Sequence, residues 1–187
     1  NYFTTLVSAY KKIKNAASYP DVMAAKKTPI AHAPAQKPES SLPLVVLPAS
    51  KSNDEPLLFF ISGDGGWTSF DQSVCEKAVA SGVPVVGLDA QKYFWQARTP
   101  DETAAEINKV LRYYLSAWNK KSFILCGYSF GADIIPYLAT RLQPDVSPLL
   151  RNMVMMSPDT KGDFEIHVAD MLNFGNSHDT YDVPAEL

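Results

Sequence analysis

A serine between two glycines is the feature of this chain that points most directly to chemistry. The segment FILCGYSFGAD at 123–133 contains Gly-Tyr-Ser-Phe-Gly at 127–131, between a strand-like apolar run and a helix-like run. Such a sharp strand-to-helix turn lifts the serine hydroxyl above the edge of a sheet, where it can act as a nucleophile. We therefore predict that Ser129 is a nucleophile in a strained backbone conformation. The alternative is a structural turn in which the serine is merely exposed.

A second glycine-rich segment, FFISGDGGWTSF at 59–70, follows an earlier apolar run. Enzymes with this serine motif bind the developing oxyanion with the amide after the serine and an amide from an earlier loop. We predict that the amide of Phe130 is the first donor. Gly65 or Gly66 is expected to supply the second, with Trp67 as an alternative, because glycine lets backbone approach a substrate oxygen closely. A plain tight loop is the competing interpretation.

The elements that position these segments are predicted from apolar runs and helix-start signals. Strands are expected at 42–48, 56–62, 83–89, 122–127 and 151–157, and helices at 71–82 and 130–142. Another helix is expected to begin at Thr99, which has capping-box spacing to Glu102. This alternation predicts right-handed crossovers and a parallel sheet with helices on both faces. Such sheets bind ligands at the carboxyl ends of their strands.

The composition suits one domain with an appendage. The chain has 187 residues, is 46% hydrophobic and carries a formal net charge of −3, which argues against nucleic acid as the main partner. No apolar run approaches the ~18 residues that a membrane-spanning helix needs. The two cysteines make neither a disulfide framework nor a zinc site, and no cofactor or metal is expected.

The N-terminal part differs in character from the rest. Residues 1–27 have the apolar spacing of an amphipathic helix, which we interpret as the helical tail of a preceding domain. A basic helix lying on a membrane surface is the alternative. Residues 28–42 contain repeated prolines and are predicted to be an extended linker, followed by the α/β domain at 43–187.

Four segments resemble the VirJ/AcvB family of bacterial virulence proteins. They are FISGDGGW at 60–67, GVPVVGLDAQKYFWQARTPDETAAEI at 82–107, GYSFGADIIPY at 127–137 and DFEIHV at 163–168. The similarity spans roughly residues 42–175 with the motifs in the family's order. The resemblance implies an α/β-hydrolase exported to the periplasm. It also implies hydrolysis of aminoacylated phosphatidylglycerol, chiefly lysyl-phosphatidylglycerol, and virulence linked to type IV secretion. AcvB-type members carry an extra domain ahead of the hydrolase, which would explain the N-terminal segments.

Release of lysine from such a lipid is ester hydrolysis through an acyl-enzyme. The lysyl headgroup carries two ammonium groups, so acidic side chains near the site are expected to bind it. Capping of a helix or loop is the structural explanation for each acid. Aromatic residues at 93–95 could line a lipid site, although ordinary packing is the preferred explanation. The candidate substrate contacts are Asp64, Asp89, Asp133, Trp67, and Arg98 for the phosphate.

The remaining triad members are expected to follow the serine, in the order acid and then histidine. After Ser157 the sequence shows one short apolar patch and no two further strands of the main sheet, so we expect that sheet to be truncated before its last strands. The resemblance implies that the acid and base lie beyond residue 187. His167, His178 and Asp159 remain as alternatives within the chain, whereas His32 precedes the serine.

Together these patterns predict a periplasmic serine esterase that acts on an aminoacylated phospholipid headgroup at the membrane surface. One alternative is a non-catalytic periplasmic adaptor on a hydrolase scaffold, which contacts secretion-system proteins. A second is an esterase without preference for aminoacyl lipids. Fold alone does not decide among them.

Overall fold

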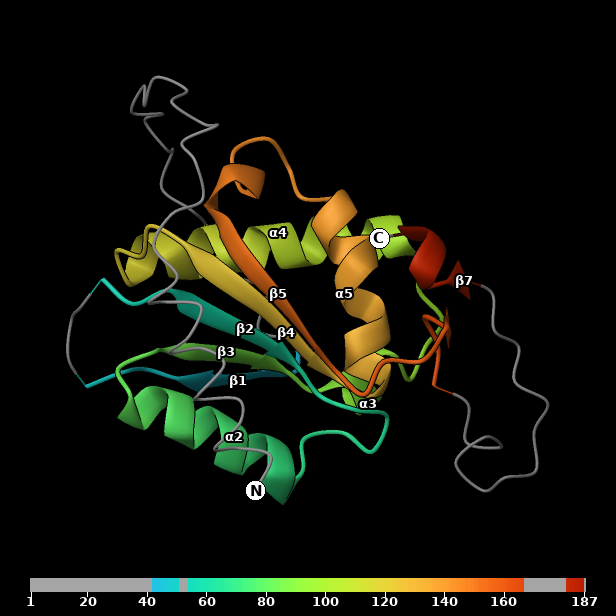
Figure 1. Cartoon of the computed structure of the whole chain (residues 1–187), viewed down its shortest axis with the longest axis horizontal. Helices are drawn as coiled ribbons and strands as arrows, with labels where there is room; N and C mark the ends of the chain where they lie inside the picture. The colour runs from blue at the N-terminus through green and yellow to red at the C-terminus, as the bar shows by residue number, and fades with distance from the viewer. Residues whose placement is uncertain (1–41, 51–53, 167–180, 187) are drawn as a thin grey trace. The chain divides into compact units, whose positions relative to one another are not determined.

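The structure is a computed structural model that describes residues 42–50, 54–166 and 181–186 (Figure 1). The predicted helical tail at 1–27, the linker up to residue 41 and all three histidines lie outside the described residues. Among the described helices, none combines the length and apolar character needed to cross a bilayer.

The described elements alternate along the chain as predicted. The strands are β1 (Leu44–Leu47), β2 (Leu57–Ile61), β3 (Val85–Leu88), β4 (Phe123–Tyr128), β5 (Leu150–Met156), β6 (Lys161–Gly162) and β7 (Tyr181–Asp182). The helices are α2 (Ser69–Ala80), α3 (Ala90–Tyr93), α4 (Pro100–Ala117) and α5 (Phe130–Thr140), with 3-10 turns η1 (Ser147–Leu149) and η2 (Pro184–Glu186).

The main sheet has five strands in the order β1-β3-β2-β4-β5. The pairings β3–β2, β2–β4 and β4–β5 are parallel, whereas β1 pairs antiparallel with β3. The antiparallel edge strand differs from the prediction of a parallel sheet. Because β2 is parallel to β3, the direction of β1 relative to β2 also sets its direction relative to β3. A β2 strand parallel to β1 would need a crossover of a dozen or more residues, and the connection from Leu47 to Leu57 is too short to contain one.

Each face of the sheet is covered by helices, as Figure 1 shows. On β2, Phe59 faces a layer shared with α4 and α5, whereas Phe60 faces a second layer shared with α2. Both side chains are fully buried, and each such burial stabilises the fold by about 1.5–3 kcal/mol. Cys75 and Cys126 lie in the second layer, and burial raises the pKa of the Cys126 thiol to about 12. The two apolar layers thus fix the strands relative to the helices on both faces of the sheet.

The start of α4 confirms the predicted capping box. The Thr99 hydroxyl accepts a hydrogen bond from the Glu102 amide at 3.2 Å, and the Thr99 amide donates to the Glu102 carboxylate at 3.0 Å. The hydrogen bond that the Thr99 amide donates to the carboxylate, and after it the one that the Thr99 hydroxyl donates at 3.0 Å, lower the pKa of Glu102. The helix begins at Pro100, and its buried stripe, including Ile107 and Leu111, packs against the sheet.

We predict that Thr99→Ala lowers the free energy of unfolding by about 1 kcal/mol, because the amide and the carboxylate of Glu102 both lose the Thr99 hydroxyl as a hydrogen-bond partner. Urea unfolding of the variant and the unmodified chain measures this difference. Ser116→Ala, an exposed change on the same helix, is the control and should shift stability little. Equal stability of Thr99→Ala and the unmodified chain would contradict this role for the cap.

Candidate active site

Ser129 lies between the end of β4 and the start of α5, at the carboxyl edge of the sheet (Figure 1). Its backbone has φ 50° and ψ −124°, a conformation that residues with side chains rarely adopt. The Ser129 amide donates to the carbonyl of Met156 at 2.9 Å, which ties the turn to the end of β5. The side chain is half-buried. The predicted strained turn at the sheet edge is confirmed, and the catalytic role of the serine stays a prediction.

The glycines that flank the serine are required by close approach of backbone. A Cβ built on Gly131 would lie 2.4 Å from the carbonyl oxygen of Ile61 and 2.5 Å from that of Ser62. A Cβ on Gly127 would lie 2.1 Å from the carbonyl oxygen of Gly131. The serine turn therefore packs directly on the end of β2, which places Ser129 beside the loop that follows that strand.

We predict that Gly131→Ala lowers the free energy of unfolding by about 2–3 kcal/mol, because the rigid backbone of Ile61 and Ser62 leaves no space for a methyl group. Gly65→Ala is the matched control, since its added Cβ would have Thr68 Cγ2, 4.0 Å away, as its nearest neighbour. Urea unfolding followed by tryptophan fluorescence compares the two. A similar loss of stability in both variants would show that the close approach at Gly131 is not the determining contact.

The first turn of α5 presents backbone amides beside the serine. Phe130 is the first residue of this helix, and an amide at that position has no acceptor within the helix. The carbonyl of Ser129 accepts from the amides of Ala132 and Asp133 at 2.7 and 3.3 Å, which anchors the turn to the helix. Because the positive end of the helix dipole lies here, negative charge that develops beside Ser129 is stabilised.

In the loop after β2, the amides of Gly65 and Gly66, which are predicted as second oxyanion donors, are both hydrogen-bonded within the loop. The Gly65 amide donates to the Asp64 carboxylate at 3.0 Å, and the Gly66 amide donates to the carbonyl of Gly63 at 3.0 Å. Gly63 is the loop residue next to the serine, since a Cβ built on it would lie 3.6 Å from Ser129 Cβ. The following amide, of Asp64, donates to no acceptor within the described residues. In the sequence, Gly63 is the first glycine after β2, and it was the signal that would have indicated the Asp64 amide as a donor.

Aromatic side chains cover both neighbours of Ser129. The ring of Phe70 lies 4.7 Å from that of Tyr128, and the ring of Phe94 lies 5.1 Å from that of Phe130, measured between centroids. Phe70 is 45% exposed, and Trp95, which follows Phe94, is 56% exposed.

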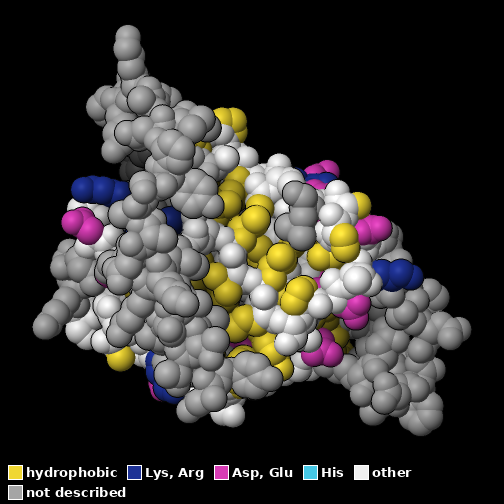
Figure 2. Space-filling model, viewed as in Figure 1, with side chains coloured by type: hydrophobic (Ala, Val, Ile, Leu, Met, Phe, Trp, Pro, Cys, Tyr) yellow, Lys and Arg dark blue, Asp and Glu magenta, His cyan; other side chains and the backbone are white. Residues whose placement is uncertain are grey.

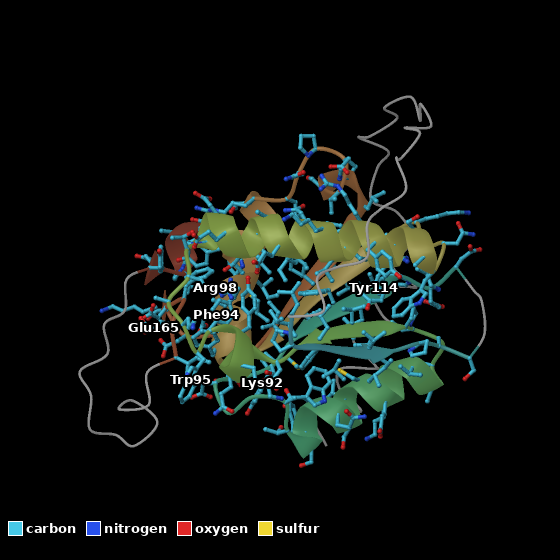
Figure 3. All side chains as sticks on the ribbon, turned by 180° about the vertical axis from the view of Figure 1, so that it is seen from behind. Lys92, Phe94, Trp95, Arg98, Tyr114 and Glu165 are labelled. Atoms are coloured by element: carbon cyan, nitrogen blue, oxygen red, sulfur yellow. The ribbon has the colours of Figure 1, made fainter. Side chains whose placement is uncertain are left out.

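In Figure 3 Trp95 lies at the margin of the described residues, near Lys92. Figure 2 shows further hydrophobic side chains around β5, where Met153 is exposed.

Asp89 and Arg98, two of the predicted substrate contacts, are engaged in structural interactions. Asp89 is buried and caps α3, where its carboxylate accepts from the Lys92 amide at 3.3 Å and pairs with Lys92 Nζ at 2.8 Å. The Arg98 guanidinium lies 4.1 Å from the centre of the Tyr93 ring and 3.3 Å from the Glu106 carboxylate. Burial and the hydrogen bond to Glu106 raise the pKa of Tyr93. In this structure Asp89 stabilises the start of α3, and Arg98 stabilises the loop between α3 and α4.

The other predicted contacts divide between the interior and the surface. Trp67 Nε1 donates to Gln72 Oε1 at 2.8 Å, and its ring packs so closely on Gly87 that a Cβ there would lie 2.2 Å away. Trp67 therefore belongs to the layer under α2. Asp133 is buried in the first turn of α5. Of the three acids predicted to contact the substrate, Asp64 is the exposed one, and it follows the glycine that lies against Ser129.

The partners of a catalytic serine are only partly placed. The alternative bases His167 and His178 lie outside the described residues, as does His32. Asp159, the alternative acid, lies after β5, and its carboxylate accepts from the amide of Thr160 at 2.5 Å. The described site thus comprises a strained serine, helix-end amides, a glycine loop and an aromatic surround.

The mostly parallel sheet, the strained serine turn and the adjoining glycine loop define an α/β-hydrolase-like fold. Est1E from Butyrivibrio proteoclasticus, solved with ferulic acid bound, is similar at TM-score 0.51 and 15% identity, over 76% of this chain and 57% of that one. MenH from S. aureus has TM-score 0.49 and 18% identity over 70% and 46% of the two chains. The siderophore hydrolase EstB from Aspergillus fumigatus has TM-score 0.48 and 17% identity over 67% and 45%. This chain spans about half the length of these structures. The predicted fold class is confirmed.

The model of the bacterial virulence protein (VirJ) family matches residues 55–187, so the chain belongs to that family. The family assignment that the sequence motifs indicated is thereby confirmed. No curated protein matches the chain.

Proposed function

We propose that the protein is a periplasmic serine hydrolase that cleaves the aminoacyl ester of lysyl-phosphatidylglycerol-type lipids and acts in virulence. The observation that carries the proposal is the strained Ser129 turn, which holds a half-buried hydroxyl beside the amide-rich start of α5. The fold shared with Est1E and membership of the VirJ family support hydrolysis and virulence respectively. The aminoacyl lipid and the compartment rest on the sequence motifs of the VirJ/AcvB type.

In the proposed reaction Ser129 Oγ attacks the carbonyl carbon of the aminoacyl ester and passes its proton to a general base, expected to be a histidine. The carbonyl electron pair moves to oxygen, where the amides of Phe130 and Asp64 donate to it. Collapse of the intermediate expels the glycerol oxygen of the lipid, which takes up the proton. Water then cleaves the lysyl–serine ester and releases lysine.

The charge at the site fits a cationic aminoacyl group. Asp64 is exposed next to the glycine that adjoins the serine, and its carboxylate uses one oxygen to accept from the Gly65 amide. The remaining oxygen is available to an ammonium group of a lysyl ester. Asp64 thus serves twice in the proposal, through its amide toward the oxyanion and through its carboxylate toward the headgroup.

The surface around the site fits a substrate that lies in a membrane. Phe70 is exposed and packs on Tyr128, and Trp95 is exposed and follows Phe94, which packs on Phe130. Exposed aromatic side chains favour the interface between water and lipid headgroups. We therefore propose that these two residues bring the serine to the bilayer surface.

We predict that Ser129→Ala in the full-length protein lowers the hydrolysis of lysyl-phosphatidylglycerol by at least about 10³-fold and abolishes labelling by a fluorophosphonate. The variant loses the atom that forms the acyl-enzyme. Ser73→Ala, an exposed change on α2, is the matched control and should keep both activities. A folded wild type that neither reacts with the probe nor releases lysine would contradict the proposal.

Further outcomes of the same assay distinguish the alternatives. Equal turnover of lysyl-phosphatidylglycerol, alanyl-phosphatidylglycerol and a simple soluble ester would indicate an esterase without lipid preference. Loss of hydrolysis in Ser129→Ala with virulence intact would indicate an adaptor role in secretion.

We predict that Trp95→Ala slows hydrolysis of lysyl-phosphatidylglycerol in vesicles several-fold and leaves hydrolysis of a soluble ester unchanged, because burial of the indole at the interface is lost. Val46→Ala, which truncates an exposed apolar side chain on β1, is the control. An equal decrease with both substrates would show that Trp95 acts on the catalytic geometry and not on membrane contact.

A further inference from the structure

Asp133 is a buried carboxylate in the first turn of α5, four residues after the serine. It is 7% exposed, and its Oδ1 accepts a hydrogen bond from the amide of Asp159 at 2.7 Å. A carboxylate is costly to bury unless hydrogen bonds compensate for the lost water. The acceptor role toward Asp159 therefore offers a structural reason for an acid at this position, distinct from contact with a substrate.

The segment held by Asp133 leaves the sheet immediately beside the serine. It begins after β5 with Ser157, whose φ is 54°, and continues into the tight turn at Asp159 and Thr160. Gly162 of β6 packs against Asp133, since a Cβ built on Gly162 would lie 3.2 Å from Asp133 Cβ. The amide of Val183, the residue after β7, donates to the carbonyl of Thr160 and so connects the β7 end to this turn.

Two hydrogen bonds fix this segment to the serine turn. The Ser129 amide donates to the Met156 carbonyl at 2.9 Å, and the Asp133 carboxylate accepts from the Asp159 amide at 2.7 Å. The Asp133 amide in turn donates to the Ser129 carbonyl at 3.3 Å. Residues 156–159 are therefore held at both ends by residues 129 and 133. Removal of the carboxylate leaves one attachment, at the sheet, and releases the other.

We propose that Asp133 is a positioning residue: it holds the segment 157–160 beside Ser129 and thereby maintains the geometry of the serine turn. The inference rests on the proposed hydrolase function for its kinetic consequence, but not for the structural one. It replaces the earlier expectation that Asp133 contacts the cationic headgroup.

The test compares Asp133→Ala with Asp133→Asn in the full-length protein, because asparagine retains an oxygen acceptor for the Asp159 amide. We expect Asp133→Ala to lower kcat for a soluble ester and the rate of fluorophosphonate labelling about 10- to 100-fold, with KM changed little. Asp133→Asn should restore most of the rate. Asp145→Ala, which removes an ion pair with Arg112, is the control and should lower Tm without lowering kcat.

Hydrogen exchange of the Asp159 amide measures the attachment independently of catalysis. We expect faster exchange in Asp133→Ala and near wild-type exchange in Asp133→Asn. Unchanged exchange would overturn the inference, as would unchanged kcat in a folded Asp133→Ala. A rise in KM for a lysyl ester alone would instead indicate substrate contact. If the wild type shows no hydrolase activity, the proposed function fails while the exchange result still decides the positioning role.

A second variant covers the case in which Asp133→Ala does not fold. Gly162→Ala keeps the carboxylate but inserts a methyl group 3.2 Å from Asp133 Cβ and 3.3 Å from Val183 Cγ2. This change should displace β6 from α5, speed hydrogen exchange of the Asp159 amide and lower kcat, as expected for Asp133→Ala. Wild-type exchange and kcat in a folded Gly162→Ala protein would overturn the inference.

Discussion

The site depends on the contact between the backbone of Gly131 and the carbonyl oxygens of Ile61 and Ser62, where no side chain fits. This contact presses the start of α5 onto the end of β2, so the strand β4 must turn sharply before the helix begins. The positive φ of Ser129 is the conformational cost of that turn. The two apolar layers of the sheet supply the compensating stability, because each of them buries side chains of both β2 and β4.

Several polar residues near the site maintain loops rather than face a ligand. Asp89 caps α3, and Arg98 lies between Tyr93 and Glu106. Buried or half-buried charges of this kind need partners close by, and helices α3 and α4 supply them through Lys92, Tyr93 and Glu106. The exposed Asp64 is the contrasting case, since its position on the loop tip leaves it in contact with water. The division between structural and available charge is thus decided by burial.

The sequence predicted features whose cause is local and missed those whose cause lies far along the chain. The Thr99 capping box depends on residues within a few positions, and the serine turn is marked by a glycine two positions away on either side of Ser129, so both patterns were readable. The antiparallel direction of β1, the internal hydrogen bonds of Gly65 and Gly66, and the pairing of Asp133 with Asp159 depend on loop geometry or on contacts across many residues. No periodicity or spacing encodes such contacts, so they required the structure.

Burial of Cys75 and Cys126 in the layer beneath α2 has a practical consequence. These are the two cysteines of the chain, and burial is the main cause that raises the pKa of each thiol. Because the thiolate is the reactive species, alkylating reagents encounter an inert sulfur while the fold is intact. Uptake of such a reagent would therefore report opening of that layer, and the native protein carries its own sensor of local unfolding.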